Sequence, residues 1–362
     1  MSADRRILLI GGTGFIGSFL APELQRLGAD VAVLTRGRSG DPGAAGLTRI
    51  IGDRKRLRGS ASAVRAFAPD IVVDLVLASG AQAQELMAVM RGIATRVVAL
   101  SSMDVYRACG VLHGLEEGPL EPVPLTEDSP LRTKHSTYPP AQIAFLQNVF
   151  GWLDDDYDKI PVERAILGDA ELPGTVLRLP MVYGPGDPLH RFWPLVKRMD
   201  DGRRVILMTP AMAAWRSPRG YVENVAVAIA LAASSDAAAG RVYNVAESPA
   251  YSELEWGRRV AAITDWHGEF VILPPERMPA HLRSPANYDH HWTTDSTRIR
   301  SELGFTERVD VDTAIRRTIV WERANPPAVP LAPIDYDAED AAVASITSDG
   351  QAMTDAGGSS PN

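Results

Sequence analysis

Cysteine is nearly absent from this 362-residue chain, in which Cys109 stands alone, so no internal disulfide can form. The chain has 7 histidines and no His/Cys cluster at metal-ligand spacing. The neighbours His290 and His291 would point apart in an extended segment, so we interpret them as structural. We therefore predict no metal site. The scarcity of cysteine is typical of a reducing compartment and predicts a cytoplasmic location.

Long apolar runs and basic blocks are missing as well. No apolar stretch approaches the length of a membrane span, and Met1–Arg6 followed by Ile7–Ile10 is too short for a signal peptide. The formal net charge is −8. These features predict neither a membrane nor a nucleic acid as partner. A local basic pocket around Arg36, Arg38 and Arg54 would suit a small anionic ligand better than a polymer.

Hydrophobic residues make up 45% of the chain and charged residues 23%, which is ordinary for a globular protein with a large core. Short apolar segments alternate with segments of helical periodicity, and no hairpin signals join the strands. This alternation predicts parallel strands joined by right-handed crossovers, which is an α/β fold with a doubly wound sheet of the Rossmann type. The expected strands are residues 7–10, 30–34, 49–51, 71–76, 96–100 and 175–179.

The pattern changes after Asp187 to longer loops punctuated by proline. We expect residues 1–180 to form the nucleotide-binding domain, with 219–246 returning to it. Residues 181–325 would mostly form a smaller C-terminal substrate-binding cap. Residues 326–362 are rich in Pro, Ala, Asp, Ser and Gly, so we expect a flexible tail there.

Three glycines, Gly11, Gly14 and Gly17, follow the first strand with the spacing G-x-x-G-x-x-G. Gly11 would permit a tight turn, Gly14 would let backbone N–H groups approach phosphates, and Gly17 would let the following helix lie close on the sheet. The N-terminus of that helix favours an anion. The structural alternative is a plain tight turn between a strand and a helix. The context, an apolar strand before the turn and an amphipathic helix after it, favours a dinucleotide cofactor.

The end of the second strand bears on the choice of cofactor. Folds selective for NAD usually place Asp or Glu there to bind the ribose hydroxyls, whereas an arginine suits the 2′-phosphate of NADP. This chain has Arg36 at that point, which favours NADP over NAD, although a solvated loop arginine is the alternative. Asp53, after the third strand, could accept a hydrogen bond from the adenine amino group.

Hydroxyl and carboxylate side chains follow the fifth strand in the segment Ser101-Ser102-Met103-Asp104-Val105-Tyr106. The carboxyl edge of such a sheet is where ligands bind in this architecture. Ser102 and Asp104 are therefore candidates for chemistry. Their structural alternatives are a strand-end serine satisfied by backbone and a carboxylate that caps the following turn.

With these pieces placed, the chain resembles the extended short-chain dehydrogenase/reductase superfamily, in its NAD-dependent epimerase/dehydratase group, over about the first nine-tenths of its length. The stretches that carry the resemblance occur in the family's order. They are the glycine turn Gly11–Gly17, the Ser-Ser-x-x-Val-Tyr strand end at Ser101–Tyr106, the Arg-x-x-x-Val-Tyr-Gly-Pro-Gly turn at Arg178–Gly186, Arg219–Ala226, Val242–Val245 and Asp295–Phe305.

The resemblance implies a catalytic unit of a Ser or Thr, a Tyr with a lowered pKa, and a Lys four residues after the Tyr. Ser102 matches the hydroxyl position, and Lys159 with Glu163 matches the family's Lys-x-x-x-Glu spacing. The tyrosine departs from the pattern, because Asp155 stands four residues before Lys159. Tyr157 is the displaced candidate, and a surface tyrosine is its alternative. A second candidate is Tyr138, although Gln142 stands where its lysine would be.

Asp104 and Met181 bear on the type of reaction and on the substrate that the resemblance implies. The dehydratases of the family use an acid at the position of Asp104 as the base, which makes Asp104 a catalytic candidate. Nucleotide-sugar enzymes usually carry Asn before Val-Tyr-Gly-Pro, and this chain has Met181, which cannot donate a hydrogen bond to a diphosphate or sugar. That substitution argues against a nucleotide-sugar substrate, while Arg216 or Arg219 could still hold a phosphate or carboxylate.

The resemblance implies an NAD(P)-dependent oxidoreductase or epimerase that transfers a hydride at a carbinol or carbonyl carbon of a small polar substrate, with a homodimer as its expected assembly. The alternative is a cofactor-binding sensor or partner-binding protein that has lost its chemistry, which the displaced tyrosine permits. If Asp155 lined the pocket in place of the tyrosines, it would pair with Asp104 as acid and base. The residues expected to hold the cofactor are Gly11, Thr13, Gly14, Phe15, Ile16, Gly17, Arg36, Asp53, Arg54, Leu75, Val76, Leu77, Ser101, Lys159, Leu179, Pro180 and Val182.

Overall fold

A computed structural model describes residues 5–37, 46–135, 138–328 and 333–355, so Arg38 lies outside the described residues. Its main feature is a seven-stranded sheet in the order β3-β2-β1-β4-β5-β6-β10, and every neighbouring pair is parallel. The doubly wound fold is thus confirmed. The strands are β1 (Arg6–Ile10), β2 (Asp30–Thr35), β3 (Thr48–Ile51), β4 (Ile71–Asp74), β5 (Arg96–Ser102), β6 (Gly174–Leu179) and β10 (Val242–Asn244).

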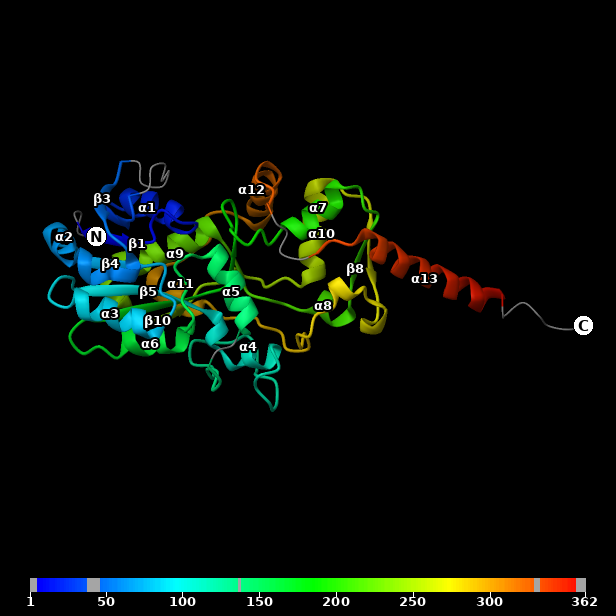
Figure 1. Cartoon of the computed structure of the whole chain (residues 1–362), viewed down its shortest axis with the longest axis horizontal. Coiled ribbons are helices and arrows are strands. Elements are labelled where there is room, and N and C mark those ends of the chain that lie inside the picture. Colours follow the sequence, from blue (N-terminus) through cyan, green and yellow to red (C-terminus); the bar gives the residue numbers. More distant parts are fainter. Residues whose placement is uncertain (1–4, 38–45, 136–137, 329–332, 356–362) are drawn as a thin grey trace, which may run out of the picture.

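Helices cover both faces of this sheet (Figure 1). Successive side chains of a strand point to opposite faces, so a strand between two helical layers must be apolar throughout. In β1, Ile7 and Leu9 pack into the core cluster that contains α1 (Gly17–Arg26) and α9 (Val222–Ser234). Leu8 and Ile10 pack into the opposite cluster with α2 (Ala61–Phe67), α3 (Gly80–Met90) and α6 (Lys159–Leu167).

A smaller region extends beyond one end of the sheet, on the right of Figure 1. Its centre is a two-stranded parallel sheet of β8 and β11, and α7 and α12 pack against α10. Between the two regions β7 pairs with β9, and the chain then returns through α9 to β10 in the main sheet. The elements are β7 (Met181–Tyr183), α7 (Trp193–Asp200), β8 (Val205–Met208), α8 (Pro210–Ala214), β9 (Arg219–Tyr221), α10 (Glu253–Thr264), β11 (Glu269–Ile272) and α12 (Val311–Ala324).

Short elements complete the described chain. α4 and α5 follow β5 in sequence, and α11 follows the last strand of the smaller region. Within the described residues, five 3-10 segments lie between the larger elements. The bounds are α4 (Arg107–Leu112), α5 (Pro140–Val149), α11 (Thr297–Leu303), η2 (Arg54–Ser60), η3 (Met103–Val105), η4 (Asp236–Ala238), η5 (Pro275–Arg277) and η6 (Ala280–Leu282).

Where the composition predicted a flexible tail, the structure differs and has the helix α13 (Tyr336–Asp355). Its first turn is anchored on the smaller region by the buried carboxylate of Glu339, which accepts hydrogen bonds from Arg198 and lies 3.0 Å from His281 Nε2. Composition cannot reveal this, because the two partners of Glu339 come from distant parts of the chain. None of the described helices combines the length and the apolar character that a membrane span requires.

Candidate functional site

The site lies at the carboxyl edge of the sheet, where the strand order reverses between β1 and β4. Two cavities adjoin each other there, and Trp152 lines both of them. The smaller has a volume of about 290 Å³ and the larger about 720 Å³. Taken together, the two cavities form a site large enough for a small-molecule ligand.

The glycine turn forms one wall of the smaller cavity. Gly11 has a φ of +85°, which other residues rarely adopt, and a Cβ on Gly17 would come within 2.5 Å of the Gly11 carbonyl oxygen. A Cβ on Gly14 would meet only that same oxygen, at 3.4 Å, so packing within the protein does not require a glycine there. The open space in front of Gly14 and the start of α1 behind it fit a pyrophosphate that approaches the backbone.

Most residues expected to hold the cofactor line one of the two cavities. The two exceptions are Gly17 and Leu77. Gly17 is buried beneath the glycine turn, and the fully buried Leu77 accepts a hydrogen bond from Lys159 Nζ with its backbone carbonyl. The others divide between the smaller cavity (Gly11, Thr13, Gly14, Arg36, Asp53, Arg54 and Val76) and the larger one (Phe15, Ile16, Leu75, Ser101, Lys159, Leu179, Pro180 and Val182).

The charged residues of the smaller cavity are not equally available to a ligand. Arg36 is exposed at its rim. Arg54, in contrast, is buried, and its Nε donates to Asp74 Oδ2 over 2.7 Å. This ion pair balances the charge of Arg54 inside the protein, while its Nη1 has no hydrogen-bond partner among the described residues, so a role of Arg54 toward an anion stays a prediction. Sequence reasoning missed Asp74 because it ends an otherwise apolar strand. Asp53 Oδ1 accepts from the backbone N–H of Lys55 over 3.0 Å, which leaves its other oxygen for a ligand.

The side chain of Ser101 belongs to a buried hydrogen-bonded cluster. Its hydroxyl donates to Glu163 Oε1 over 2.5 Å, and Glu163 forms a two-point ion pair with Arg178 at 2.8 and 3.0 Å. All three side chains are buried. The Ser101 side chain therefore holds β5, β6 and α6 together, whereas the hydroxyl of its neighbour Ser102 does not take part in this cluster.

Asp104 is the centre of the larger cavity's polar wall. It lies in η3 directly after β5, with 2% of its surface exposed. Its Oδ2 accepts from the hydroxyl of Tyr157 over 3.1 Å and from that of Tyr138 over 3.3 Å. Its Oδ1 is buried without a hydrogen-bond partner among the described residues. The Ser102 hydroxyl oxygen accepts from the Asp104 N–H over 3.2 Å and keeps its own proton for another acceptor.

Lys159 is the first residue of α6, so Tyr157 lies in the loop before the helix and reaches the cavity from there. The buried ammonium donates to the carbonyls of Leu77 and Leu100, the latter over 3.1 Å. It also lies 5.7 Å from the centre of the Tyr157 ring. Burial lowers the pKa of Lys159 from 10.5 to about 8.

The proton affinities of these groups differ from the pattern that the resemblance implies. Burial first, and then the Asp104 carboxylate, raise the pKa of Tyr157 and of Tyr138 well above the ordinary value. Burial also raises the pKa of Asp104, against the attraction of Arg132 and Lys159. The phenols therefore remain protonated at neutral pH. A buried carboxyl group whose pKa is raised above its ordinary value is a candidate proton acceptor.

Several candidates from the sequence lie away from this centre. Asp155 is exposed, accepts from Gln147 over 2.8 Å and lines neither cavity. Arg216 is paired with Glu255 at 2.8 Å, and Arg219 with Glu253 at 2.6 Å. Sequence reasoning also missed the aromatic lining of the larger cavity, because its members come from distant segments without a shared motif: Trp152, Trp215, Tyr288 and Trp292.

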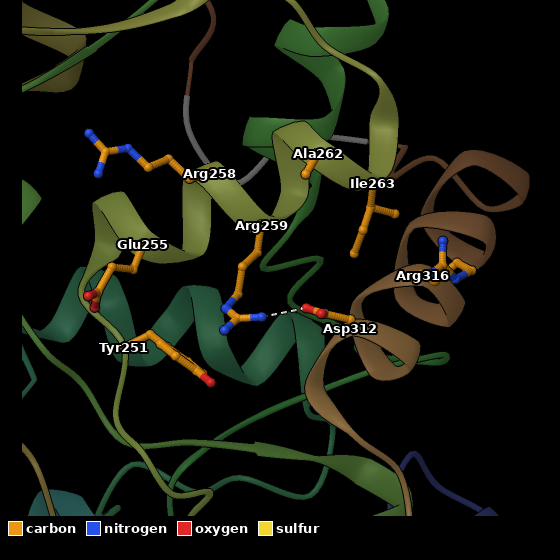
Figure 2. Close-up of a pocket in the computed structure, with 8 residues that line it drawn as sticks. All are labelled: Tyr251, Glu255, Arg258, Arg259, Ala262, Ile263, Asp312 and Arg316. Atoms are coloured by element: carbon orange, nitrogen blue, oxygen red, sulfur yellow. Dashed lines mark hydrogen bonds and ion pairs between the residues drawn. The ribbon is translucent and has the colours of Figure 1, made fainter.

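A third hollow, of about 500 Å³, lies on the smaller region between α10 and α12 (Figure 2). Arg259 bridges the two helices through Asp312 at 2.6 Å and lies over the Tyr251 ring, 4.2 Å from its centre. This third hollow shares no lining residue with the two cavities at the sheet edge. It also contains none of the residues expected to bind a cofactor or to act in catalysis, so we assign the functional site to the sheet edge.

Comparison with known proteins shows a family match and similar folds. The model of the NAD dependent epimerase/dehydratase family matches residues 7–246. A candidate epimerase from Burkholderia cenocepacia has a similar fold, with a TM-score of 0.65 and 21% identity over 88% of this chain and 98% of that one. So does the UDP-glucose 4-epimerase of Thermus thermophilus, in complex with NAD, with a TM-score of 0.59 and 22% identity over 88% and 99%.

A curated relative matches over a shorter stretch. The chloroplast stem-loop binding protein of 41 kDa b from Arabidopsis thaliana is 29% identical over 136 residues, which span 33% of this chain. The match covers 35% of that protein's length. At these identities the solved structures establish the fold, and the family match covers the whole main sheet with the residues of both cavities up to Pro218.

Proposed function

Because this chain belongs to the NAD dependent epimerase/dehydratase family, we propose that it is an enzyme that transfers a hydride at a carbinol or carbonyl carbon of a small molecule. Ser102, Asp104, Tyr157 and Lys159 would be its catalytic residues. The observation that carries the proposal is their convergence on one cavity beside the glycine turn. The displaced tyrosine, which the sequence alone left open, has its hydroxyl 3.1 Å from Asp104.

The geometry supports a proton relay. A nicotinamide cofactor, when bound, supplies or accepts the hydride. In oxidation, the substrate hydroxyl would give its proton to the Tyr157 oxygen while Tyr157 passes its own proton to Asp104 Oδ2; in reduction, both protons would move the other way. No tyrosinate accumulates in either direction, which agrees with the raised pKa of Tyr157. The raised pKa of Asp104 suits it as the final proton acceptor.

Ser102 and Lys159 would support this relay from two sides. The free hydroxyl proton of Ser102 would be donated to the substrate oxygen. The Lys159 ammonium, buried behind the Tyr157 ring, would stabilise negative charge on Asp104 and would bind the cofactor's ribose. Both roles need Lys159 in its charged form.

The residues of the smaller cavity fit a dinucleotide. The open face of Gly14 would receive the pyrophosphate, and the free oxygen of Asp53 would face the adenine. We propose NADP as the preferred cofactor and NAD as the alternative, because Arg36 at the end of β2 is an exposed cation that lines the smaller cavity, as does the exposed Lys55. We further propose that residues 1–180 with 219–246 form the cofactor domain and that 181–325 supply walls for the substrate. The cytoplasmic location and the homodimer stay predictions.

Nicotinamide absorbance at 340 nm, followed with the full chain and a panel of alcohols, ketones and sugars, tests the proposal by turnover. We expect Lys159→Ala to abolish turnover while the protein still binds cofactor. If no substrate-dependent change occurs although cofactor binds, or if Lys159→Ala and Ser102→Ala leave the biological activity intact while Gly14→Asp abolishes it, the protein is a cofactor-binding sensor.

A further inference from the structure

The charge balance and the walls of the larger cavity bear on its substrate. Resting on the proposed function, we infer that the substrate is an uncharged, largely apolar cyclic alcohol or ketone, in place of the small polar molecule that the resemblance implied. A nucleotide sugar, with its charged diphosphate, would not be accepted. Three independent features carry this inference: the paired cations, the two arginines outside the cavity and the aromatic wall.

The cations of the larger cavity are already neutralised. Among the described residues that line it, Lys159 and Arg191 carry the positive charge, and burial lowers the pKa of His113, which keeps it neutral. Lys159 is surrounded by backbone carbonyls and faces Asp104. Arg191 Nη1 lies 2.6 Å from the buried Asp187 carboxylate. Two carboxylates thus balance two cations, and a diphosphate would enter without a counter-charge.

The two arginines that could have held a diphosphate point to other partners. Arg216 pairs with Glu255, and Arg219 donates from Nη2 to both carboxylate oxygens of Glu253, at 2.6 and 2.7 Å. Neither arginine lines the larger cavity, although their neighbours Trp215 and Pro218 do. A substrate phosphate would have to compete with a glutamate for either arginine, and it would have to do so outside the cavity.

Part of the wall of the larger cavity is aromatic and aliphatic. The rings of Trp215 and Tyr288 pack edge to face, with centres 5.2 Å apart. Trp292 is 9% exposed, and its buried indole N–H has no acceptor among the described residues. Met181 lines the same space with a thioether. Such a wall favours a ring with a hydroxyl or carbonyl over a polyhydroxylated sugar.

The test compares two classes of probe on the full chain loaded with NADP(H) or NAD(H). The apolar probes are cyclohexanone, 1-indanone and 1-tetralone with their alcohols, and the charged probes are UDP-glucose and UDP-glucuronic acid. Binding is read from the shift of the melting temperature and from quenching of tryptophan fluorescence, and turnover from nicotinamide absorbance. We expect the apolar probes to bind and turn over with KM values between about 1 μM and 1 mM, and the UDP-sugars to do neither.

A matched pair of variants locates the binding. Met181→Asn restores the polar residue that is usual in nucleotide-sugar enzymes, and it should lower kcat/KM for 1-indanone by at least about tenfold while the cofactor dissociation constant stays unchanged. Val320→Asn makes a similar change at a position on α12 that is 64% exposed, and it should alter neither quantity.

The two readouts separate this inference from the proposed function. If the apolar ketones bind without turnover, hydride transfer fails while the ligand class stands. If a UDP-sugar binds more tightly or turns over faster than the ketones, the ligand class is wrong while hydride transfer stands. If neither class binds to protein that holds its cofactor, or if Met181→Asn has no effect on the ketones, the inference is overturned.

Discussion

The smaller cavity takes most of its wall from residues 10–76, whereas the larger cavity gathers side chains from positions as far apart as Phe15 and Trp292. In the smaller one, a few positions of the glycine turn decide the shape of the backbone and leave space for a ligand. In the larger one, the decisive contacts join Asp104 to two tyrosines that lie 34 and 53 residues further along the chain. The residues of the smaller cavity that are expected to bind the cofactor therefore lie close together in the sequence, whereas long-range packing brings the proposed catalytic residues together.

The largest effect should come from the glycine turn, where two single substitutions break the smaller cavity differently. Gly17→Ala places a Cβ against the backbone of Gly11 and Gly12, and it should lower the free energy of unfolding by about 1–3 kcal/mol and abolish cofactor binding. Gly14→Asp should weaken cofactor binding with a much smaller loss of stability, because only the ligand's space is filled.

Thermal unfolding and nicotinamide fluorescence titration measure the two effects on the same samples. Equal loss of stability in both variants would show that Gly14 serves the fold. Unchanged cofactor affinity in Gly14→Asp would show that the pyrophosphate does not approach this turn.

The next largest effect should come from Asp104 in the larger cavity. Asp104→Asn keeps the shape of the side chain but removes the proton acceptor, so kcat should fall by about 10²–10⁴ with cofactor affinity unchanged. Asp155→Asn is the matched control, because Asp155 is an exposed carboxylate outside both cavities. Steady-state kinetics measure kcat for both variants. A loss of kcat confined to Asp155→Asn would contradict the placement of the site.

A smaller effect should appear in the pH profile. The pKa of Lys159 is lowered to about 8, so the charged form that the mechanism needs is present below that pH and lost above it. The free enzyme's kcat/KM should therefore fall by about tenfold per pH unit above about pH 8. In Lys159→Arg this fall should vanish, because guanidinium stays charged to about pH 12. A fall that persists unchanged in the variant would assign it to another group.

The smallest effect should be the cofactor preference set at the rim of the smaller cavity. Arg36→Ala should reduce the affinity for NADPH relative to NADH by about tenfold, because an exposed arginine contributes modestly to phosphate binding. Arg58→Ala, at an exposed position that lines neither cavity, is the control. Fluorescence titration with both cofactors measures the ratio. If the wild type prefers NADH and Arg36→Ala leaves that ratio unchanged, the arginine plays no part in selection.

The difference between local and long-range contacts explains how much of the fold and of the candidate site could be predicted from the sequence. Apolar strands and the glycine spacing are local signals, so the doubly wound sheet was predicted and is confirmed. The loop position of Tyr157 depended on where α6 begins, and the Asp158 side chain sets that point by accepting from the Ile160 N–H. The pairing of Arg54 with Asp74, the aromatic wall and the anchoring of α13 through Glu339 arise from contacts between distant residues, which periodicity and spacing do not encode.

The central claim is that Tyr157, displaced from its usual spacing to Lys159, carries the proton between substrate and Asp104. The most direct test is the single-turnover rate of hydride transfer in Tyr157→Phe and in Tyr138→Phe, with cofactor affinity measured alongside. Tyr157→Phe should lose about 10²-fold or more. Tyr138→Phe, which removes only a second hydrogen bond to the same carboxylate oxygen, should stay within roughly tenfold of the wild type. A wild-type rate in Tyr157→Phe, or a larger loss in Tyr138→Phe, would contradict the claim.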